Sequence, residues 1–313
     1  MVKGTPPPVR SELATVRNRL SFLYCEHCTV HRDANALTIT DERGTVHVPT
    51  AALSSLLLGP GTRTTHAAMS VLGDSGVTVV WVGKRGVRFY ACGRPLAKSS
   101  RMAEVQAAVV SNQRRRLQSA RKMYALRFPG EDVSGLTMHQ LRGREGVRMK
   151  RIYTAEAQRT GVQWSRRQYS PDDFEAGDDI NRALTAASAA LYGVAHAAIV
   201  SLGCIPSLGV VHSGTDRSFV YDVADLFKAE VSIPAAFDAV QAASDSGDDP
   251  AVAVRRLVRD RMVGIRLMPR LVEAIFSVLN EPVSDELVDA DLVLWSEFER
   301  VTAGMNWASE DVR

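Results

Sequence analysis

The spacing of apolar residues changes near residue 95 of this 313-residue chain, and that change constrains the fold more than any other feature. Up to about Tyr90, short runs rich in β-branched residues alternate with turn residues, which is typical of strands. After the Gly- and Pro-containing segment 93–100, apolar residues recur at helical spacing. Strands followed by helices predict an α+β protein, with an N-terminal β-sandwich domain and then an all-α domain. We place these domains at 1–95 and 96–280, followed by an acidic tail at 281–313.

The first region carries a hairpin signal. Residues Ala36–Thr40 and Thr45–Val48 have strand patterns and are joined by a turn at 41–44. The β-branched run Val77–Val82 predicts a buried strand, and Thr65–Leu72 predicts a short helix between strands.

The second region predicts long helices. The helical patterns cover Ala103–Arg127, His139–Thr160, Ile180–Leu202, Ala235–Ala243 and Pro250–Asn280. We find no apolar run approaching the length that spans a membrane, and the N-terminus lacks the apolar core of a signal peptide. The expected location is therefore the cytoplasm.

Basic residues are concentrated at the start of the helical region. Residues 101–170 contain 15 basic and five acidic residues, whereas 281–313 contain nine acidic residues and two arginines. The net charge of +3 therefore conceals a surplus of ten positive charges over residues 1–280. Such a surplus indicates a polyanionic partner, most simply nucleic acid, although arginine-rich helices also occur as solvated faces. The arginines that we expect to contact DNA here are Arg142, Arg148, Arg166 and Arg167.

The stretch Val210–Lys228 opens on an apolar run, passes through a Gly-containing turn and enters an amphipathic segment. Three of its polar residues stand out: His212, Asp222 and Asp225. If the chain is helical from Tyr221, the two aspartates lie on one face, and Asp222 falls in the first turn, where the helix dipole favours a carboxylate. Two carboxylates near an imidazole can hold Mg²⁺ or Mn²⁺. The alternative from these residues alone is a helix cap, a solvated aspartate and a histidine packed in the core.

Two further features leave alternatives open. Glu145 lies between Gly143 and Gly146, so another helix or a substrate backbone can approach it closely, but it can also pair with an arginine of its own helix. Cys25 and Cys28 form a C-x-x-C pair without a second pair at zinc spacing, so free thiols are expected rather than a zinc or redox site.

Several motifs together resemble the CRISPR-associated spacer-acquisition integrase and endonuclease family, the first of the numbered Cas proteins. The resemblance extends over about 20–267 and preserves the order and spacing of the motifs. Those in the helical region are Leu141–Arg148, Leu191–Val194, Gly209–Gly214 and Phe219–Asp225. Those in the strand region are Gly61–Ala68 and Trp81–Tyr90, which are similar to the type I-E branch.

The resemblance implies a role for each matching residue. Glu145, His212 and Asp225 match the family's metal ligands, and Asp222 matches a neighbouring acid that supports the site. Tyr192 matches a tyrosine close to the site. The arginines of the strand region that match DNA contacts are Arg63 and Arg88. One departure concerns the tyrosine that stacks on the duplex end in type I-E members. In this sequence Cys25 occupies that position, and Tyr24 is one position away. Because a shift of one residue places a side chain on the opposite face of a strand, Tyr24 takes this role only if the strand register moves.

The function implied is a metal-dependent DNA integrase that joins the 3′-hydroxyl ends of a captured DNA duplex to the CRISPR repeat array by transesterification, with nuclease activity on branched DNA. The expected cofactor is Mg²⁺ or Mn²⁺. The expected assembly is a homodimer, two of which are bridged by a dimer of a small ferredoxin-fold Cas partner. Two other classes stay open: a metal-dependent nuclease without a joining role, and a non-catalytic nucleic-acid-binding protein.

Overall fold

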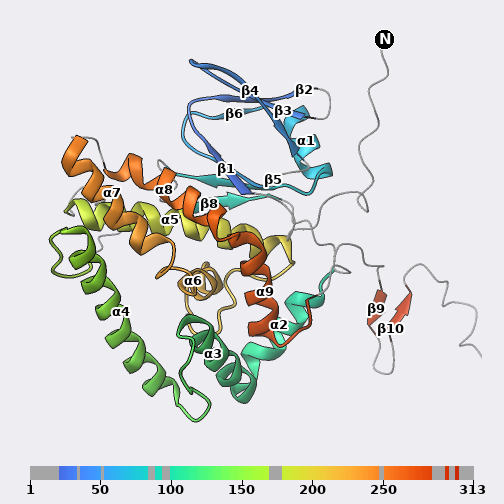
Figure 1. The fold of residues 1–313 in the computed structure, drawn as a ribbon. Coiled ribbons are helices and arrows are strands. Elements are labelled where there is room, and N and C mark those ends of the chain that lie inside the picture. Colours follow the sequence, from blue (N-terminus) through green and yellow to red (C-terminus); the bar gives the residue numbers. More distant parts are fainter. Residues whose placement is uncertain are drawn as a thin grey trace, which may run out of the picture.

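The structure is a computed structural model, and it describes residues 21–33, 36–50, 53–83, 89–93, 99–168, 178–246, 250–283, 293–295 and 300–302. Within these ranges, strands come first and helices follow (Figure 1), so the predicted α+β class is confirmed. The proposed DNA contact Arg88 lies outside the described residues. Residues 95 and 280 remain our proposed domain boundaries.

Two four-stranded sheets build the N-terminal part (Figure 1). The first has the order β1-β5-β7-β8, with β8 antiparallel to β7 and the other neighbours parallel. Its strands are β1 (Ser21–Cys25), β5 (Leu53–Leu58), β7 (Thr78–Val82) and β8 (Phe89–Cys92). The second has the order β4-β3-β2-β6, and its strands are β2 (Thr29–Asp33), β3 (Ala36–Asp41), β4 (Gly44–Pro49) and β6 (Arg63–Thr64). Strands β3 and β4 form the predicted hairpin, with Asp41 opposite Gly44.

Apolar side chains of both sheets and of α1 (His66–Asp74) form one core. Val30, Leu37, Leu56 and Leu72 are fully buried in it. Helix α1 begins where the sequence predicted, because the side chain of Thr65 caps it by accepting a hydrogen bond from the Ala68 nitrogen.

The other face of the first sheet packs against α5 (Asp179–Ser201), the central helix of the second part. Gly193 of α5 lies so close to β5 that a Cβ atom there would be 2.9 Å from Leu57 Cδ2. The buried hydroxyls of Thr78 and Ser201 lie 2.9 Å apart across the same contact. The first sheet therefore lies between the second sheet and the helices, and this packing joins the two parts of the molecule.

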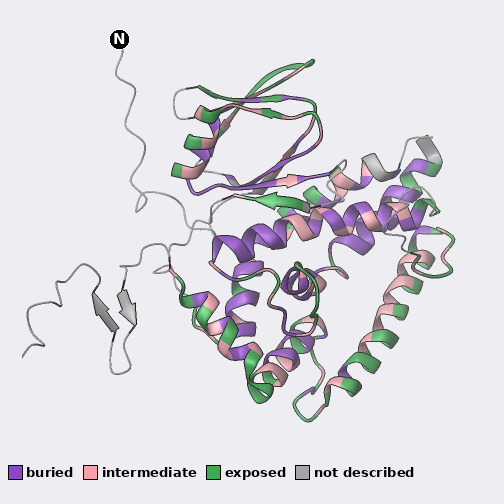
Figure 2. Ribbon diagram, turned by 180° about the vertical axis from the view of Figure 1, so that it is seen from behind, coloured by how far each residue is buried: buried purple, intermediate pink, exposed green. Residues whose placement is uncertain are grey.

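Helix α5 is surrounded by α6, α7, α8 and α9 and is buried along most of its length (Figure 2). Its many alanines let these neighbours approach closely. By contrast, α4 lies at the edge of the molecule, and its buried residues are Leu141 and Thr160. The remaining helices are α2 (Arg101–Ser111), α3 (Gln113–Arg127), α4 (Met138–Thr160), α6 (Ser218–Asp225), α7 (Ser232–Ser246), α8 (Pro250–Gly264) and α9 (Leu267–Leu279).

Among the described residues, α5 is the one helix whose length and composition would allow it to cross a membrane. The expectation that the chain has no apolar run of that length is therefore wrong. In the most apolar 18-residue segment of α5, 72% is buried inside the protein, so α5 is a core helix.

Two predicted helices are interrupted. The helix expected over Ala103–Arg127 breaks at Asn112, whose side chain caps α3 by accepting hydrogen bonds from the nitrogens of Arg114 and Arg115. An asparagine side chain competes with the helical backbone in this way. The helix expected over Pro250–Asn280 breaks at Arg266, which has a left-handed φ of 51°. A short antiparallel pair, β9 (Val293–Trp295) and β10 (Arg300–Thr302), lies in the segment that we described only as an acidic tail.

Candidate active site

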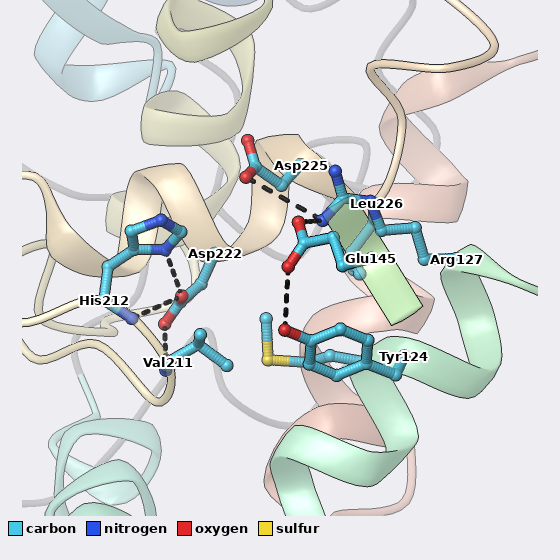
Figure 3. A pocket seen from close by; sticks show the side chains of 9 residues that line it. Tyr124, Arg127, Glu145, Val211, His212, Asp222, Asp225 and Leu226 are labelled. Carbon is cyan, nitrogen blue, oxygen red and sulfur yellow. Dashed lines mark hydrogen bonds and ion pairs between the residues drawn. The ribbon is translucent and has the colours of Figure 1, made fainter. Parts of the chain in front are cut away.

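Three of the four motifs of the helical region meet at one pocket (Figure 3), where α3, α4, α6 and the loop before α6 converge. It brings together four of the predicted site residues from segments far apart in the chain. The lining residues are Met123, Tyr124, Arg127, Glu145, Val211, His212, Asp222, Asp225 and Leu226.

Asp222 is fully buried beneath the loop that carries His212. Its Oδ2 accepts hydrogen bonds from the backbone nitrogens of Val210 (2.5 Å) and Val211 (3.1 Å), and its Oδ1 accepts one from the nitrogen of His212 (2.9 Å). We expected Asp222 in the first turn of a helix, which is wrong. Helix α6 already begins at Ser218, so loop amides rather than the start of the helix stabilise this carboxylate.

The same carboxylate orients the imidazole of His212. Its Oδ1 lies 2.8 Å from His212 Nδ1, so an ionised Asp222 requires Nδ1 to carry the proton and leaves Nε2 as the nitrogen with a free lone pair. The hydrogen bond to Asp222 raises the pKa of His212, although burial opposes the shift.

Gly209 makes this loop possible. A Cβ atom at this position would lie 2.9 Å from the backbone carbon of Ser218, at the start of α6. The glycine in the motif therefore allows the loop to fold back onto α6, which brings the backbone amides to Asp222.

The other two carboxylates of the pocket are held by cations. Glu145 forms an ion pair with Arg127 and accepts a 2.8 Å hydrogen bond from the hydroxyl of Tyr124. Asp225 lies 4.0 Å from Arg127 through Oδ2 and 2.5 Å from Lys228 Nζ through Oδ1. An ion pair of Glu145 within its own helix, the alternative from the sequence, is therefore wrong.

Two pKa shifts reflect these contacts. Burial and the hydrogen bond to Glu145 raise the pKa of Tyr124, which keeps its hydroxyl protonated as a donor. Burial opposes the charge on Lys228, but Asp225 and Tyr192 outweigh it and raise its pKa. Both side chains thus keep their protons over the neutral range.

Tyr192 lies beside this pocket and does not line it. Its half-buried ring meets Tyr221 edge to face at 5.1 Å between centroids, and Lys228 Nζ lies 5.0 Å from the ring centre. Because Lys228 also contacts Asp225, Tyr192 is connected to the predicted metal ligands through one side chain.

The predicted DNA contacts occupy different environments. Arg63, Arg142 and Arg166 are exposed. Arg148 pairs with Glu131 and covers the ring of Phe128. The guanidinium of Arg167 bonds to Asn181 and Thr185 of α5, which indicates a role in anchoring the loop to that helix.

Tyr24 and Cys25 occupy opposite faces of β1. Cys25 is buried in the core between the sheets, whereas Tyr24 packs against the face that meets the helices. The hydroxyl of Tyr24 donates to Glu26 at 2.6 Å, and Arg255 lies 5.4 Å from the ring centre. Cys25 and Cys28 are free buried thiols, as expected.

Three residues of the site were not predicted from the sequence: Tyr124, Arg127 and Lys228. Lys228 could have been predicted from the sequence, because it follows Asp225 by three residues, the spacing at which opposite charges pair on a helix. Arg127 belonged to a basic region that we assigned to DNA binding, and only the packing of α3 on α4 shows its contact with Glu145.

Comparison with known proteins identifies the family. Residues 22–128 match the family model described as CRISPR associated protein Cas1. The chain is also 45% identical, over 297 residues, to the CRISPR-associated endonuclease Cas1 of Clostridium sp. (strain SY8519), an alignment covering 95% of this chain and 98% of that protein. The chain belongs to the Cas1 family.

Other Cas1 proteins support the assignment. The chain is 40% identical to a Cas1 of Thermus thermophilus, covering 97% of each chain, and 36% identical to Cas1 of Escherichia coli, covering 84% of this chain and 86% of that protein. The structure of a TtCas1–DNA complex has a TM-score of 0.65 at 42% identity, covering 84% of this chain and 97% of that chain. A casposase bound to integration product shares the fold with a TM-score of 0.62 at 15% identity, covering 85% of this chain and 92% of that chain. The Cas1 relatives among them are named CRISPR-associated endonucleases.

The side chains of this Cas1 pocket suit a divalent cation by their chemistry. Three carboxylates and an imidazole line it, and oxygen and imidazole nitrogen ligands are those that Mg²⁺ and Mn²⁺ accept. Among the residues that the structure describes, however, no three His, Cys, Asp or Glu side chains are gathered closely enough to hold a metal ion. Arg127 and Lys228 instead lie on the oxygens that would serve as ligands.

Proposed function

We propose that this Cas1 protein is a metal-dependent DNA integrase, which joins the 3′-hydroxyl ends of a captured DNA duplex to the repeat array and also cuts branched DNA. The single observation that carries the proposal is the convergence of Glu145, His212 and Asp225 on one pocket from three separate segments. The endonuclease names of the relatives are consistent with it.

Glu145, His212 and Asp225 would hold Mg²⁺ or Mn²⁺ in this proposal. The bound cation would stabilise charge on the phosphate oxygens and lower the pKa of the attacking hydroxyl. Asp222 contributes by orientation: it fixes the ring of His212 so that Nε2 is available as a ligand.

The basic surface would position the DNA. Arg63 on the sheet and Arg142 and Arg166 in the helical part are exposed and available to phosphates. Tyr192 would act as a positioning residue through Lys228, which contacts both its ring and Asp225. A covalent tyrosine intermediate is not part of the proposal, because a bound cation would already supply activation of the attacking hydroxyl.

We further propose a homodimer in the cytoplasm, bridged to a second one by a small ferredoxin-fold partner dimer. A captured duplex has two ends, and a two-fold assembly presents equivalent sites to both. Light scattering of the protein alone and with its partner tests this: a stable monomer, or a dimer that never binds the partner, would contradict it.

A joining assay on branched DNA, with and without Mn²⁺, tests the activity. We expect Asp225→Ala and His212→Ala to abolish joining and nicking while DNA binding persists, because the basic surface lies elsewhere. Asp216→Ala is the matched control, since this exposed aspartate precedes α6 and does not line the pocket. Nicking without joining would favour the simple nuclease, and binding without either reaction would favour a non-catalytic protein.

A further inference from the structure

Arg127 is a charged residue of the pocket to which the reaction proposed above gives no role. It is the last residue of α3, and its side chain is only 9% exposed. One terminal nitrogen pairs with Glu145 and lies 4.0 Å from Asp225 Oδ2, and the other lies 3.2 Å from Met149 Sδ. Its Nε is buried and has no hydrogen-bond partner.

These contacts place a positive charge between the two carboxylates proposed to bind the divalent cation. A guanidinium that pairs with Glu145 and faces Asp225 repels a second cation and covers oxygens that it would use. Lys228 differs, because it lies on the other oxygen of Asp225, beside Tyr192.

We propose that Arg127 is a resident cation of the Glu145–Asp225 pair, which a divalent ion must displace, and that the displaced guanidinium then binds a DNA phosphate in the same pocket. This inference rests on the proposed metal-dependent function. The buried Nε without a partner supports the second step, because it leaves a donor available to a ligand that enters the pocket.

The surroundings of Arg127 allow such an exchange. The residue lies in the last turn of α3, where the helix dipole favours a positive charge whether or not Glu145 is bound. The ring of Phe128 lies 5.5 Å from its guanidinium carbon and offers a second cation contact. The side chain can therefore leave the carboxylates without becoming an isolated buried charge.

Removal of the charge provides the test. We expect Arg127→Gln to bind Mn²⁺ about tenfold more tightly than the wild type, measured by calorimetry and by the electron paramagnetic resonance signal of free Mn²⁺. The metal-free variant should melt at a lower temperature than the wild type, and saturating Mn²⁺ should narrow this difference. The matched control is Arg121→Gln, because Arg121 is also a partly buried arginine of α3, but it bonds to the Leu136 carbonyl. Its Mn²⁺ affinity should be that of the wild type.

The outcomes separate this inference from the function on which it rests. Equal or weaker Mn²⁺ binding by Arg127→Gln, with normal binding by the wild type, overturns the displacement and leaves the proposed function standing. If neither protein binds Mn²⁺, both fail. If Arg127→Gln does not fold, Arg127→Met answers the same question, since methionine is also long and unbranched but carries no charge, and it should also bind Mn²⁺ more tightly.

The phosphate contact has a separate readout. At saturating Mn²⁺, single-turnover joining by Arg127→Gln should be ten- to a hundredfold slower than by the wild type, despite tighter metal binding. An unchanged rate would overturn this second step.

Discussion

The carboxylate of Asp222 holds both the ring and the main chain of His212: Oδ1 lies 2.8 Å from the imidazole Nδ1 and 2.9 Å from the backbone nitrogen. The other oxygen holds the nitrogens of Val210 and Val211. One buried side chain therefore shapes the loop and selects the histidine nitrogen that faces a ligand.

Asp222→Asn should destabilise the fold as well as impair joining. In the variant, the NH₂ group of the asparagine faces a backbone N–H that the aspartate oxygen accepted from. At least one buried hydrogen bond to a charged group is therefore lost, which lowers the free energy of unfolding by about 3 kcal/mol. Urea denaturation measures this loss. Asp216→Asn is the control and should leave the free energy of unfolding within about 0.5 kcal/mol of the wild type. An unchanged stability of Asp222→Asn would contradict the role assigned to this carboxylate.

Tyr192→Phe should reduce joining by ten- to a hundredfold, corresponding to about 1.4–2.7 kcal/mol of barrier. The substitution keeps the ring contact with Tyr221 and removes only the hydroxyl, which helps to hold Lys228 beside Asp225. Single-turnover kinetics measure the effect. Unchanged kinetics would mean that Tyr192 only packs, whereas a protein–DNA adduct on a denaturing gel would show that it is a nucleophile.

DNA affinity should fall steeply as salt rises. If about six phosphates are neutralised, log K should decrease with log salt at a slope near −5. Fluorescence anisotropy between 50 and 200 mM salt, roughly the range over which such binding weakens strongly, gives this slope. A slope shallower than about −2 would show that the basic helices do not bind DNA.

Acid should destabilise the protein through His196, which is 3% exposed in α5. Burial, and then the charge of Arg217, lower its pKa from 6.5 to about 4. Below pH 6.5 the unfolded chain therefore binds a proton that the folded protein does not bind until about pH 4. The stability is complete above pH 6.5, and about 3 kcal/mol is lost as the pH falls to 4.

The free energy of unfolding, measured between pH 4 and 7 for the wild type and for His196→Asn, isolates this contribution. The variant should show a smaller decrease with falling pH, whatever its absolute stability. Parallel curves would mean that His196 does not titrate differently in the two states.

Gly143→Ala and Gly146→Ala should each stabilise α4 by about 1 kcal/mol, because glycine is a poor helix former and open space surrounds both positions. We expect slower joining all the same, since both glycines flank Glu145 on the exposed side of α4, where a DNA backbone would approach. Gly264→Ala in α8, which also has open space around it, is the control and should leave joining unchanged. Stabilised variants that join at the normal rate would rule out a close approach to this face.

Local sequence patterns were sufficient for the order of strands and helices and for several element boundaries. Thr65 caps the helix that it was expected to begin, and Thr137 and Asp178 cap α4 and α5 within two residues of their predicted starts, because capping depends on a few adjacent residues. The motif resemblance was sufficient for the family and for four residues of the pocket, since motif order is a property of the chain itself.

Only the tertiary structure decided how those residues are used. Asp222 draws its stabilisation from backbone amides 10 to 12 positions earlier in the chain. Arg127 and Glu145 come from different helices and meet because α3 packs against α4. Ion pairs and buried carboxylates depend on distances between segments, which the spacing of residues along one segment does not encode. For this reason the basic region appeared uniform in the sequence, while the fold places one of its arginines, Arg127, in the candidate active-site pocket.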